Sequence, residues 1–326
     1  RGRPPKPRLP QAELEFSAAC SAARRREVED VVEWWNSGSE TYTLHTSGST
    51  GAPKEMLLQR SHIEASARAT IAFFGLIEGQ RSPLLLSAKT VGGFMMVVRA
   101  LVAGLKLDIL PVERRPATRP GLRYDFVALV PEQAAALAAD PKFNPKDFRC
   151  TLLGGADVRP ELEEALSKWP RPVYHGYGMT ETLSHVALRK LGHGRTYQGL
   201  SGVLFAQKGE ALVVDDPARG VRGLVTTDAA NVISFSEFEW LGRLDGAWVA
   251  ASDTCALDLI GATFERDVEP GEMVVIRRGR LRALRPFNFT LPVPCTDPDG
   301  DALSVWMSPT AAPPSWINFK FSPGAL

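Results

Sequence analysis

The segment best suited to chemistry is a run of hydroxyl-bearing residues and glycines that ends in a lysine. Its predicted phosphate-binding residues are Thr46, Ser47, Gly48, Ser49, Thr50, Gly51 and Lys54. Glycine lets backbone N–H groups turn toward an anion, and the hydroxyls add donors. Lys54 adds a mobile positive charge that suits phosphate. The spacing differs from the Walker loop because Ala52 and Pro53 separate Gly51 from Lys54. The alternative, a plain Ser/Gly surface loop, is disfavoured by the Pro-Lys pair and by the strand pattern before the loop.

Two later glycine-rich segments also follow predicted strands. Gly154, Gly155 and Ala156 come after the apolar run 150–153, and Gly176 to Thr182 come after the run 173–175. Glycine at such places lets the backbone approach a ligand closely. Both segments are therefore candidates for contact with a nucleotide.

Individual side chains in the second segment suit the same ligand. Tyr177 could cover a base, Thr180 could bond phosphate, and Glu181 could hold a Mg²⁺ ion that also touches phosphate oxygens. Taken alone, Tyr177 is equally typical of a core residue, and Glu181 of a solvated charge. Asp228 could bind ribose hydroxyls, whereas Arg243 and Asp245 could equally form a surface ion pair.

The elements that must position these residues alternate between strand and helix patterns. Strand patterns cover 41–45, 84–87, 107–111, 124–130, 150–153 and 173–175, and several short strands are expected over 211–234. Helix patterns cover 11–35, 61–74, 90–104, 132–139 and 160–169. This alternation predicts an α/β fold with a wound, mainly parallel sheet. Ligands of such sheets bind at the carboxyl ends of the strands, where we expect the phosphate loop to lead from a strand into a helix.

Composition favours a soluble cytoplasmic protein. The 326 residues have a net charge of +1, which gives no general case for nucleic acid or anionic membrane as partner. The 4 cysteines (Cys20, Cys150, Cys255 and Cys295) lie far apart and are typical of free thiols rather than a zinc site. No apolar run reaches the roughly 20 residues of a membrane span, and the basic N-terminus lacks the apolar region of a secretory signal.

The first ten residues, RGRPPKPRLP, are rich in proline and positive charge. Their Arg-Gly-Arg-Pro core resembles an AT-hook, which would place arginines in a narrow minor groove. One short copy favours a disordered tail or a fusion remnant over a DNA-binding segment.

The motifs together resemble the acyl-adenylate-forming (AMP-binding) superfamily. Their order is the phosphate loop, Gly-Gly-Ala, Tyr-Gly-Met-Thr-Glu, Thr-Thr-Asp and Gly-Arg-Leu-Asp. The resemblance implies ATP, Mg²⁺ and coenzyme A as cofactors, with Lys54, Thr180 and Glu181 as catalytic residues and Glu181 as the metal ligand. It implies nucleotide contacts at the phosphate loop and at Gly154, Gly155, Ala156, Tyr177, Gly178, Asp228 and Arg243. The family usually has Thr-Gly-Asp where this chain has Thr227 before Asp228.

Within that superfamily, the segment 31–246 resembles the short o-succinylbenzoate–CoA ligases of menaquinone biosynthesis. EWWN, LHTSGSTGAPK, FFGL and VGGFMMVVRALVAGLKLDI carry this likeness. It implies substrate contacts at Thr90, where many relatives have a histidine, and at Arg99, which could hold a carboxylate with two hydrogen bonds. A helix-surface position for Arg99 is an equal alternative.

The pattern changes after Gly246. Residues 251–276 resemble an internal piece of glutamine amidophosphoribosyltransferase, and 287–321 resemble a fragment of a cadherin-like repeat. Its acidic turn, Thr296 to Asp301, could hold Ca²⁺, but a turn without metal is favoured. We expect four parts: a basic, Ala-rich arm (1–28), a truncated adenylate-forming core (29–246), an appended β-type segment (247–282) and a Pro-rich fragment (283–326), so that the tail is irregular or β-rich. The simplest interpretation is a composite sequence, and fusion, misassembly and artificial generation all remain open.

The expected activity is an ATP-dependent acid–CoA ligase. A carboxylate would be adenylated and transferred to coenzyme A, impaired here because the family's C-terminal lysine domain is not recognisable. A nucleotide-binding remnant without turnover and an interaction protein are the alternatives.

Overall fold

The computed structural model describes residues 11–46, 54–119 and 121–244, together with four short strands nearer the C-terminus. The chain divides into two units, residues 1–242 and 243–326. The second unit contains two antiparallel pairs of short strands, and these pairs are β15 (Met273–Arg277) with β16 (Arg280–Leu284) and β17 (Pro294–Thr296) with β18 (Ala302–Ser304). The segment with the AT-hook pattern, Asp245, Cys255 and most of the acidic turn lie outside the described residues.

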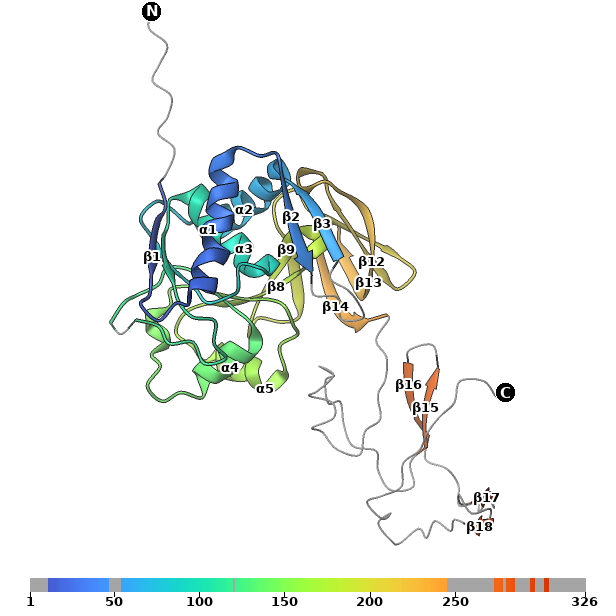
Figure 1. Ribbon diagram of the computed structural model, residues 1–326. Coiled ribbons are helices and arrows are strands. Elements are labelled where there is room, and N and C mark those ends of the chain that lie inside the picture. The colour runs from blue at the N-terminus through green and yellow to red at the C-terminus, as the bar shows by residue number, and fades with distance from the viewer. Residues whose placement is uncertain are drawn as a thin grey trace, which may run out of the picture. The chain divides into compact units, whose positions relative to one another are not determined.

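The first sheet of the larger unit has three parallel strands. Their order is β1 (Glu13–Phe16), β5 (Lys106–Ile109) and β4 (Arg81–Leu84). Helices α1 (Ala22–Ser37) and α2 (Arg60–Phe74) contact a third helix, α3 (Val91–Ala103), which also packs on β4 and β5 (Figure 1). Because α3 is apolar over most of its length, it can be buried on nearly all sides and becomes the centre of the main core.

The ends of α3 follow from the sequence. The hydroxyl of Thr90 accepts a hydrogen bond from the backbone N–H of Gly93 at the first turn. Gly104 ends the helix in the left-handed region at φ 69°, which glycine adopts without steric cost. The predicted limits of this helix are confirmed.

The second sheet has nine strands. Their order is β11 (Leu204–Lys208), β12 (Ala211–Asp216), β13 (Val221–Ser234), β14 (Glu237–Arg243), β10 (Thr196–Gly199), β9 (Ser184–Lys190), β8 (Val173–Met179), β7 (Thr151–Leu153) and β6 (Val127–Leu129). β6, β7 and β8 pair in parallel, whereas β8–β9, β9–β10, β10–β14, β11–β12 and β12–β13 pair antiparallel. The α/β class is confirmed, and among the strands that the structure describes, the parallel pairs are in β1–β5–β4 and β6–β7–β8.

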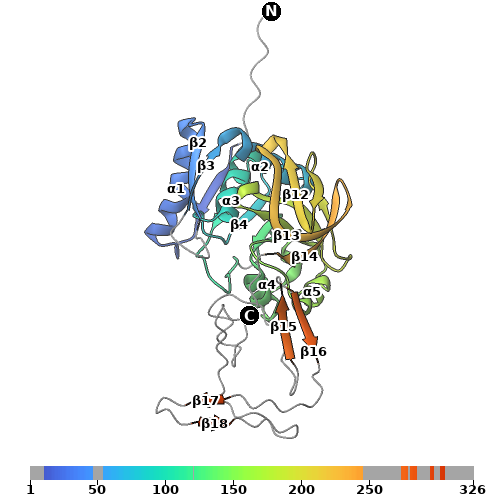
Figure 2. The ribbon, with the colours of Figure 1, turned by 90° about the vertical axis from the view of Figure 1, so that its right-hand side faces the viewer.

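Helices α4 (Pro131–Ala138) and α5 (Pro160–Ser167) connect the parallel strands of this sheet and lie side by side at one end of the larger unit (Figures 1 and 2). A second apolar core lies here and includes Val127, Leu137 and Leu166. Three short 3₁₀ turns complete the unit, at Pro145–Asp147 (η1), Thr180–Thr182 (η2) and Pro217–Arg219 (η3).

The predicted position of the phosphate loop is wrong in one respect. β2 (Thr41–Thr46) pairs antiparallel with β3 (Lys54–Gln59), and α2 begins only after β3. The segment between Thr46 and Lys54 therefore connects two strands of a separate two-stranded sheet rather than a parallel strand and a helix. The phosphate-loop residues Ser47 to Gly51 themselves lie outside the described residues, as do the side chains of Thr46 and Lys54.

Three other expectations also differ from the structure. The helix expected from residue 11 begins at Ala22, because Glu13–Phe16 forms a strand beside β5. The glycine-rich turn expected at 176–178 is part of β8, which continues to Met179. The short strands expected over 211–234 are two strands, β12 and the long β13. Among the described residues, no helix is long and apolar enough to cross a membrane.

Candidate functional site

The turn after β7 has space for a ligand against its backbone. The backbone N–H of Gly154 donates to Leu129 O at 3.1 Å, which fixes the start of the turn. Among the described residues, a Cβ added to Gly154 would meet nothing within 4 Å, and one added to Gly155 would meet only Val130 at 3.5 Å. Gly155 has φ 89°, a backbone conformation that glycine adopts readily. The prediction that a nucleotide contacts this turn is therefore sterically reasonable.

The glycines of β8 are explained by close packing against β9, not by space for a ligand. A Cβ on Gly178 would overlap the carbonyl oxygen of Ser184, and one on Gly176 would lie 3.0 Å from the Cβ of His185. These two glycines allow β8 to approach β9 closely. The structure thus explains Gly178 by strand packing, and its predicted contact with the nucleotide stays a prediction.

Tyr177 joins β8 to β13 through Asp228. The Tyr177 hydroxyl donates to Asp228 Oδ2 at 2.7 Å, and the indole N–H of Trp240 donates to Asp228 Oδ1 at 3.1 Å. Tyr177 is only 9% exposed and packs edge-on against Phe238. The structure therefore favours the core interpretation of Tyr177, and brings the predicted base-covering and ribose-binding residues into direct contact.

His175 is a site residue that the motif reading missed. Its Nε2 lies 2.9 Å from Ala156 O and its Nδ1 lies 2.7 Å from the Tyr197 hydroxyl. Because a carbonyl oxygen only accepts, Nε2 carries the proton. Burial lowers the pKa of His175 below its usual value, so the neutral ring is favoured. The alternation Val173, His175, Tyr177 along one strand face was the available signal.

The residues after β8 form a strained turn. Thr180 and Glu181 belong to η2, where Thr180 is half-buried and Glu181 is exposed. Leu183 and Ser184 follow with φ 53° and 91°, which is rare for residues other than glycine. Backbone strain of this kind persists only where surrounding contacts hold it. Here the Ser66 hydroxyl donates to Leu183 O at 2.7 Å, and Thr182 Oγ1 donates to Ser184 O at 2.8 Å.

The predicted substrate residues on α3 have different surroundings. Thr90 is exposed, and its hydroxyl donates to Ser87 O at 2.8 Å besides capping the helix. Arg99 is 1% exposed, so the surface alternative for Arg99 is wrong. Its Nη2 donates to Ser184 Oγ at 3.3 Å, whereas its Nε is buried without a hydrogen-bond partner among the described residues. Burial, and then the nearby Arg219, lower the pKa of Arg99 to about 9.

The structure thus brings most of the described motif residues together around β8. On β8, His175 hydrogen-bonds the turn at 154–156 and Tyr177 hydrogen-bonds Asp228, and Thr180 and Glu181 follow directly along the chain. Arg243 is the exposed last residue of β14. In the described part of the chain, no group of three or more metal-binding side chains is present, so Glu181 would hold Mg²⁺ only together with phosphate oxygens.

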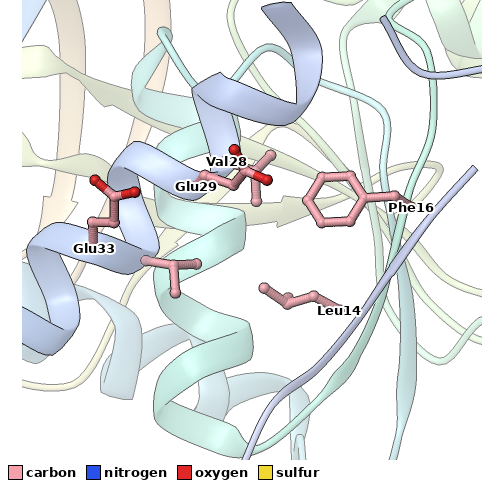
Figure 3. Close-up of a pocket in the computed structure, with 6 residues that line it drawn as sticks. Leu14, Phe16, Val28, Glu29 and Glu33 are labelled. Atoms are coloured by element: carbon pink, nitrogen blue, oxygen red, sulfur yellow. The ribbon is translucent and has the colours of Figure 1, made fainter. Parts of the chain in front are cut away.

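A groove of about 320 Å³ lies elsewhere, between β1 and α1. Figure 3 shows Leu14 and Phe16 of β1 facing Val28, Glu29 and Glu33 of α1 across it. The groove contains none of the predicted site residues, and it does not change the location of the candidate site.

Comparison with protein families gives a match over most of the chain. The family described as AMP-binding enzyme matches residues 6–233. Curated 2-succinylbenzoate–CoA ligases from Bacillus cereus and Bacillus anthracis are 27% and 28% identical over 164 and 165 residues. These matches cover 49% of this chain and 34% of each relative, so the matched region is about a third of the relatives' length.

Solved structures agree with the fold. An AMP-forming acyl-CoA synthetase/AMP-acid ligase II-like protein from Dyadobacter fermentans superposes with a TM-score of 0.64 and 31% identity, covering 70% of this chain and 67% of its own. The o-succinylbenzoate–CoA synthetase of Bacillus subtilis, in complex with ATP and magnesium, gives 0.53 at 19% identity, over 65% of this chain and 51% of its own. The second likeness, at this identity, shows the fold alone.

Some curated relatives belong to a different enzyme class. An amidophosphoribosyltransferase of Mycobacterium tuberculosis is 54% identical over 50 residues, which are 15% of this chain and 10% of that protein. It belongs to the same enzyme class that residues 251–276 resemble.

Proposed function

Because the chain belongs to the AMP-binding enzyme family, we propose that it activates a carboxylic acid with ATP and passes the acyl group to coenzyme A. The observation that carries this proposal is a pair of hydrogen bonds made from β8, where His175 bonds Ala156 O of the open turn at 154–156 and Tyr177 bonds Asp228. These bonds join three motifs that are distant in sequence at one end of the parallel strands, where α/β proteins bind ligands.

The chemistry has two steps. A carboxylate oxygen attacks the α-phosphorus of ATP, and the bond to pyrophosphate breaks. The thiol sulfur of coenzyme A then attacks the acyl carbon, AMP leaves, and the thiol proton is released. The first nucleophile is already an anion and needs no general base, so positioning and charge neutralisation carry the reaction.

Each candidate residue has a proposed role that suits its chemistry. Lys54 and the donors from Thr46 to Gly51 would bind the β- and γ-phosphates, and Thr180 the α-phosphate. The turn at 154–156 would contact adenine, with Asp228 and Arg243 at the ribose. The exposed Glu181 suits Mg²⁺, which neutralises phosphate charge when bound.

We infer an o-succinylbenzoate-like substrate, with a second carboxylate beside the one that reacts. Arg99 supports this choice because its buried guanidinium has no carboxylate partner among the described residues and its Nε has no acceptor. A buried charge without a partner destabilises a fold. A protein therefore keeps such a group where function requires it. Thr90, at the first turn of the same helix, would lie at the entrance to this part of the site.

The test measures the two steps separately on the whole chain. We expect ATP–pyrophosphate exchange that depends on o-succinylbenzoate, and formation of its CoA thioester. Glu181→Gln should slow exchange strongly, and Ser82→Ala, which changes a buried serine outside the site, should not. Binding of ATP without exchange at any acid concentration would instead support a nucleotide-binding protein without turnover.

A further inference from the structure

Five polar groups form a continuous chain through the interior beside η2. Arg99 Nη2 lies 3.3 Å from Ser184 Oγ, which lies 3.3 Å from His185 Nδ1. His185 Nε2 lies 3.2 Å from Thr70 Oγ1, and Thr70 Oγ1 lies 3.2 Å from Ser66 O. The chain joins α3 to β9 and β9 to α2. His185 and Thr70 are almost completely buried, so water does not substitute for these partners.

The two ends of this chain fix the direction of every proton. Arginine only donates, and a backbone carbonyl only accepts. Thr70 therefore donates to Ser66 O and accepts from His185 Nε2–H. His185 Nδ1 is then the acceptor for the Ser184 hydroxyl proton, and Ser184 Oγ accepts from Arg99. The three side chains between these ends, Ser184, His185 and Thr70, each donate and accept, a pattern in which hydrogen bonds strengthen one another.

Burial and neighbouring positive charges keep His185 in the neutral state that this pattern requires. Burial, then Arg99 and Arg219, hold the pKa of His185 well below its usual value. Arg219 is itself paired with Asp216 at 3.1 Å and donates to His185 O at 3.2 Å. With His185 neutral, Nδ1 remains free to accept from Ser184.

The backbone of Ser184 shows that its position is enforced. Its φ of 91° is one that serine rarely adopts, and the neighbouring Leu183 and Thr182 are anchored by hydrogen bonds. In this conformation the Ser184 Oγ lies between Arg99 and His185, within 3.3 Å of each.

We propose that Thr70, His185 and Ser184 are positioning residues that hold the Arg99 guanidinium so that its remaining N–H groups face a second anionic group of the acyl substrate. The substrate part of this inference rests on the proposed function. Ser184 accepts from Arg99 Nη2, and Nε has no acceptor among the described residues, so guanidinium N–H groups remain to bind a carboxylate.

The first test does not depend on activity. In protein with ¹⁵N-labelled histidine, the ring shifts of His185, assigned by its loss in His185→Asn, should report a neutral ring with the proton on Nε2. Thr70→Val removes the acceptor of that proton with little change of volume, and should shift the ring toward the Nδ1–H form. A proton on Nδ1 in the unmodified protein would overturn the proposed chain of hydrogen bonds from Arg99 to Ser66.

The second test compares acids. The unmodified enzyme should prefer o-succinylbenzoate to the analogue whose non-reacting carboxylate is replaced by a methyl group. Ser184→Ala and Thr70→Val should each reduce this preference by about tenfold or more, chiefly through a lower kcat/KM for the dicarboxylate. Ser82→Ala, which removes a buried serine hydroxyl that has no partner among the described residues, is the matched control and should keep the preference.

The outcomes separate the two proposals. If the unmodified protein adenylates neither acid, the proposed function fails and the ring shifts alone decide the chain of hydrogen bonds. If it prefers the dicarboxylate and both variants keep that preference, the positioning role is overturned while the proposed function stands. Equal activity with the two acids would overturn the proposal that Arg99 binds a second anionic group of the substrate.

Discussion

The Tyr177 hydroxyl donates a 2.7 Å hydrogen bond to Asp228, which joins the last parallel strand of the large sheet to its longest antiparallel strand. The two residues belong to separate motifs in sequence but form one unit in the fold. Trp240 donates to the other carboxylate oxygen at 3.1 Å. A ribose hydroxyl would therefore have to share Asp228 with these donors.

Removing the tyrosine hydroxyl should lower the free energy of unfolding without lowering the affinity for ATP. Tyr177→Phe keeps the ring against Phe238 but loses a hydrogen bond to a buried carboxylate, which typically contributes about 1.5–3 kcal/mol to the free energy of unfolding. ATP affinity should be kept, because Asp228 gains accepting capacity. Asp228→Asn should weaken both, as measured by urea unfolding and ATP titration. Equal losses of ATP affinity in the two variants would contradict the ribose role of Asp228.

A pair of glycine substitutions distinguishes a ligand-facing glycine from a packing glycine. Gly178→Ala should lower the free energy of unfolding by about 1–3 kcal/mol or more, because the new Cβ overlaps the backbone of Ser184. Gly154→Ala should change it by less than about 0.5 kcal/mol, since nothing in the described part of the chain lies within 4 Å. If the turn at 154–156 contacts adenine, Gly154→Ala should nevertheless raise the KM for ATP. An unchanged KM would exclude close contact at Gly154.

Sequence patterns predicted correctly those helices whose ends are marked by capping residues close by in the sequence. Thr90 and Gly104 bound α3 because a hydroxyl cap and a glycine end act within one turn. Strand β3 after the phosphate loop was not predicted, although Glu55, Met56, Leu57 and Leu58 alternate in exposure, because it is short and runs directly into the pattern of helix α2.

Burial of Arg99 could not be predicted, because arginine is normally exposed and only the fold places β9 and Arg219 against that side of α3. The chain of hydrogen bonds through Ser184 could not be predicted from the sequence either, since its members come from α2, α3 and β9. Contacts between residues far apart in the chain have no local signal.

Stability should fall as the pH drops below about 6.5, the ordinary pKa of histidine. Burial lowers the pKa of both His175 and His185 in the folded protein. Between the folded and unfolded pKa values, the unfolded chain binds protons that the folded chain does not, so the stability present above about 6.5 is lost as pH falls. The slope approaches about 1.4 kcal/mol per pH unit for each histidine.

Urea unfolding between pH 7.5 and 5.5 measures this slope. His175→Gln should reduce it, because one of the two groups no longer titrates and glutamine can still donate to Ala156 O. Burial raises the pKa of Glu163, but its hydrogen bond with Arg189 outweighs this and holds that pKa below its usual value, so its stabilisation is lost only at lower pH and does not interfere. A slope that is unchanged in His175→Gln would contradict the buried neutral state of His175.

Two buried arginines predict opposite effects of the same substitution. Arg24 has acceptors on all three nitrogens, namely Leu110 O at 3.1 Å, Leu84 O at 3.0 Å and Glu27 at 3.1 Å. Arg24→Met orphans these acceptors and should cost about 3–5 kcal/mol of unfolding free energy. Arg99 has one hydrogen bond, to Ser184, and lies near a second arginine. Arg99→Met should therefore stabilise the protein, by about 1–4 kcal/mol.

The same Arg99→Met variant should lose the preference for a dicarboxylate substrate, because the stabilising change removes the charge that the second carboxylate needs. Urea unfolding of both methionine variants, together with the ratio of kcat/KM for the two acids, measures this exchange of stability for selectivity. If Arg99→Met destabilised the protein as much as Arg24→Met, the guanidinium of Arg99 would be fully satisfied in the free protein. The argument that Arg99 is held ready for an anion would then fail.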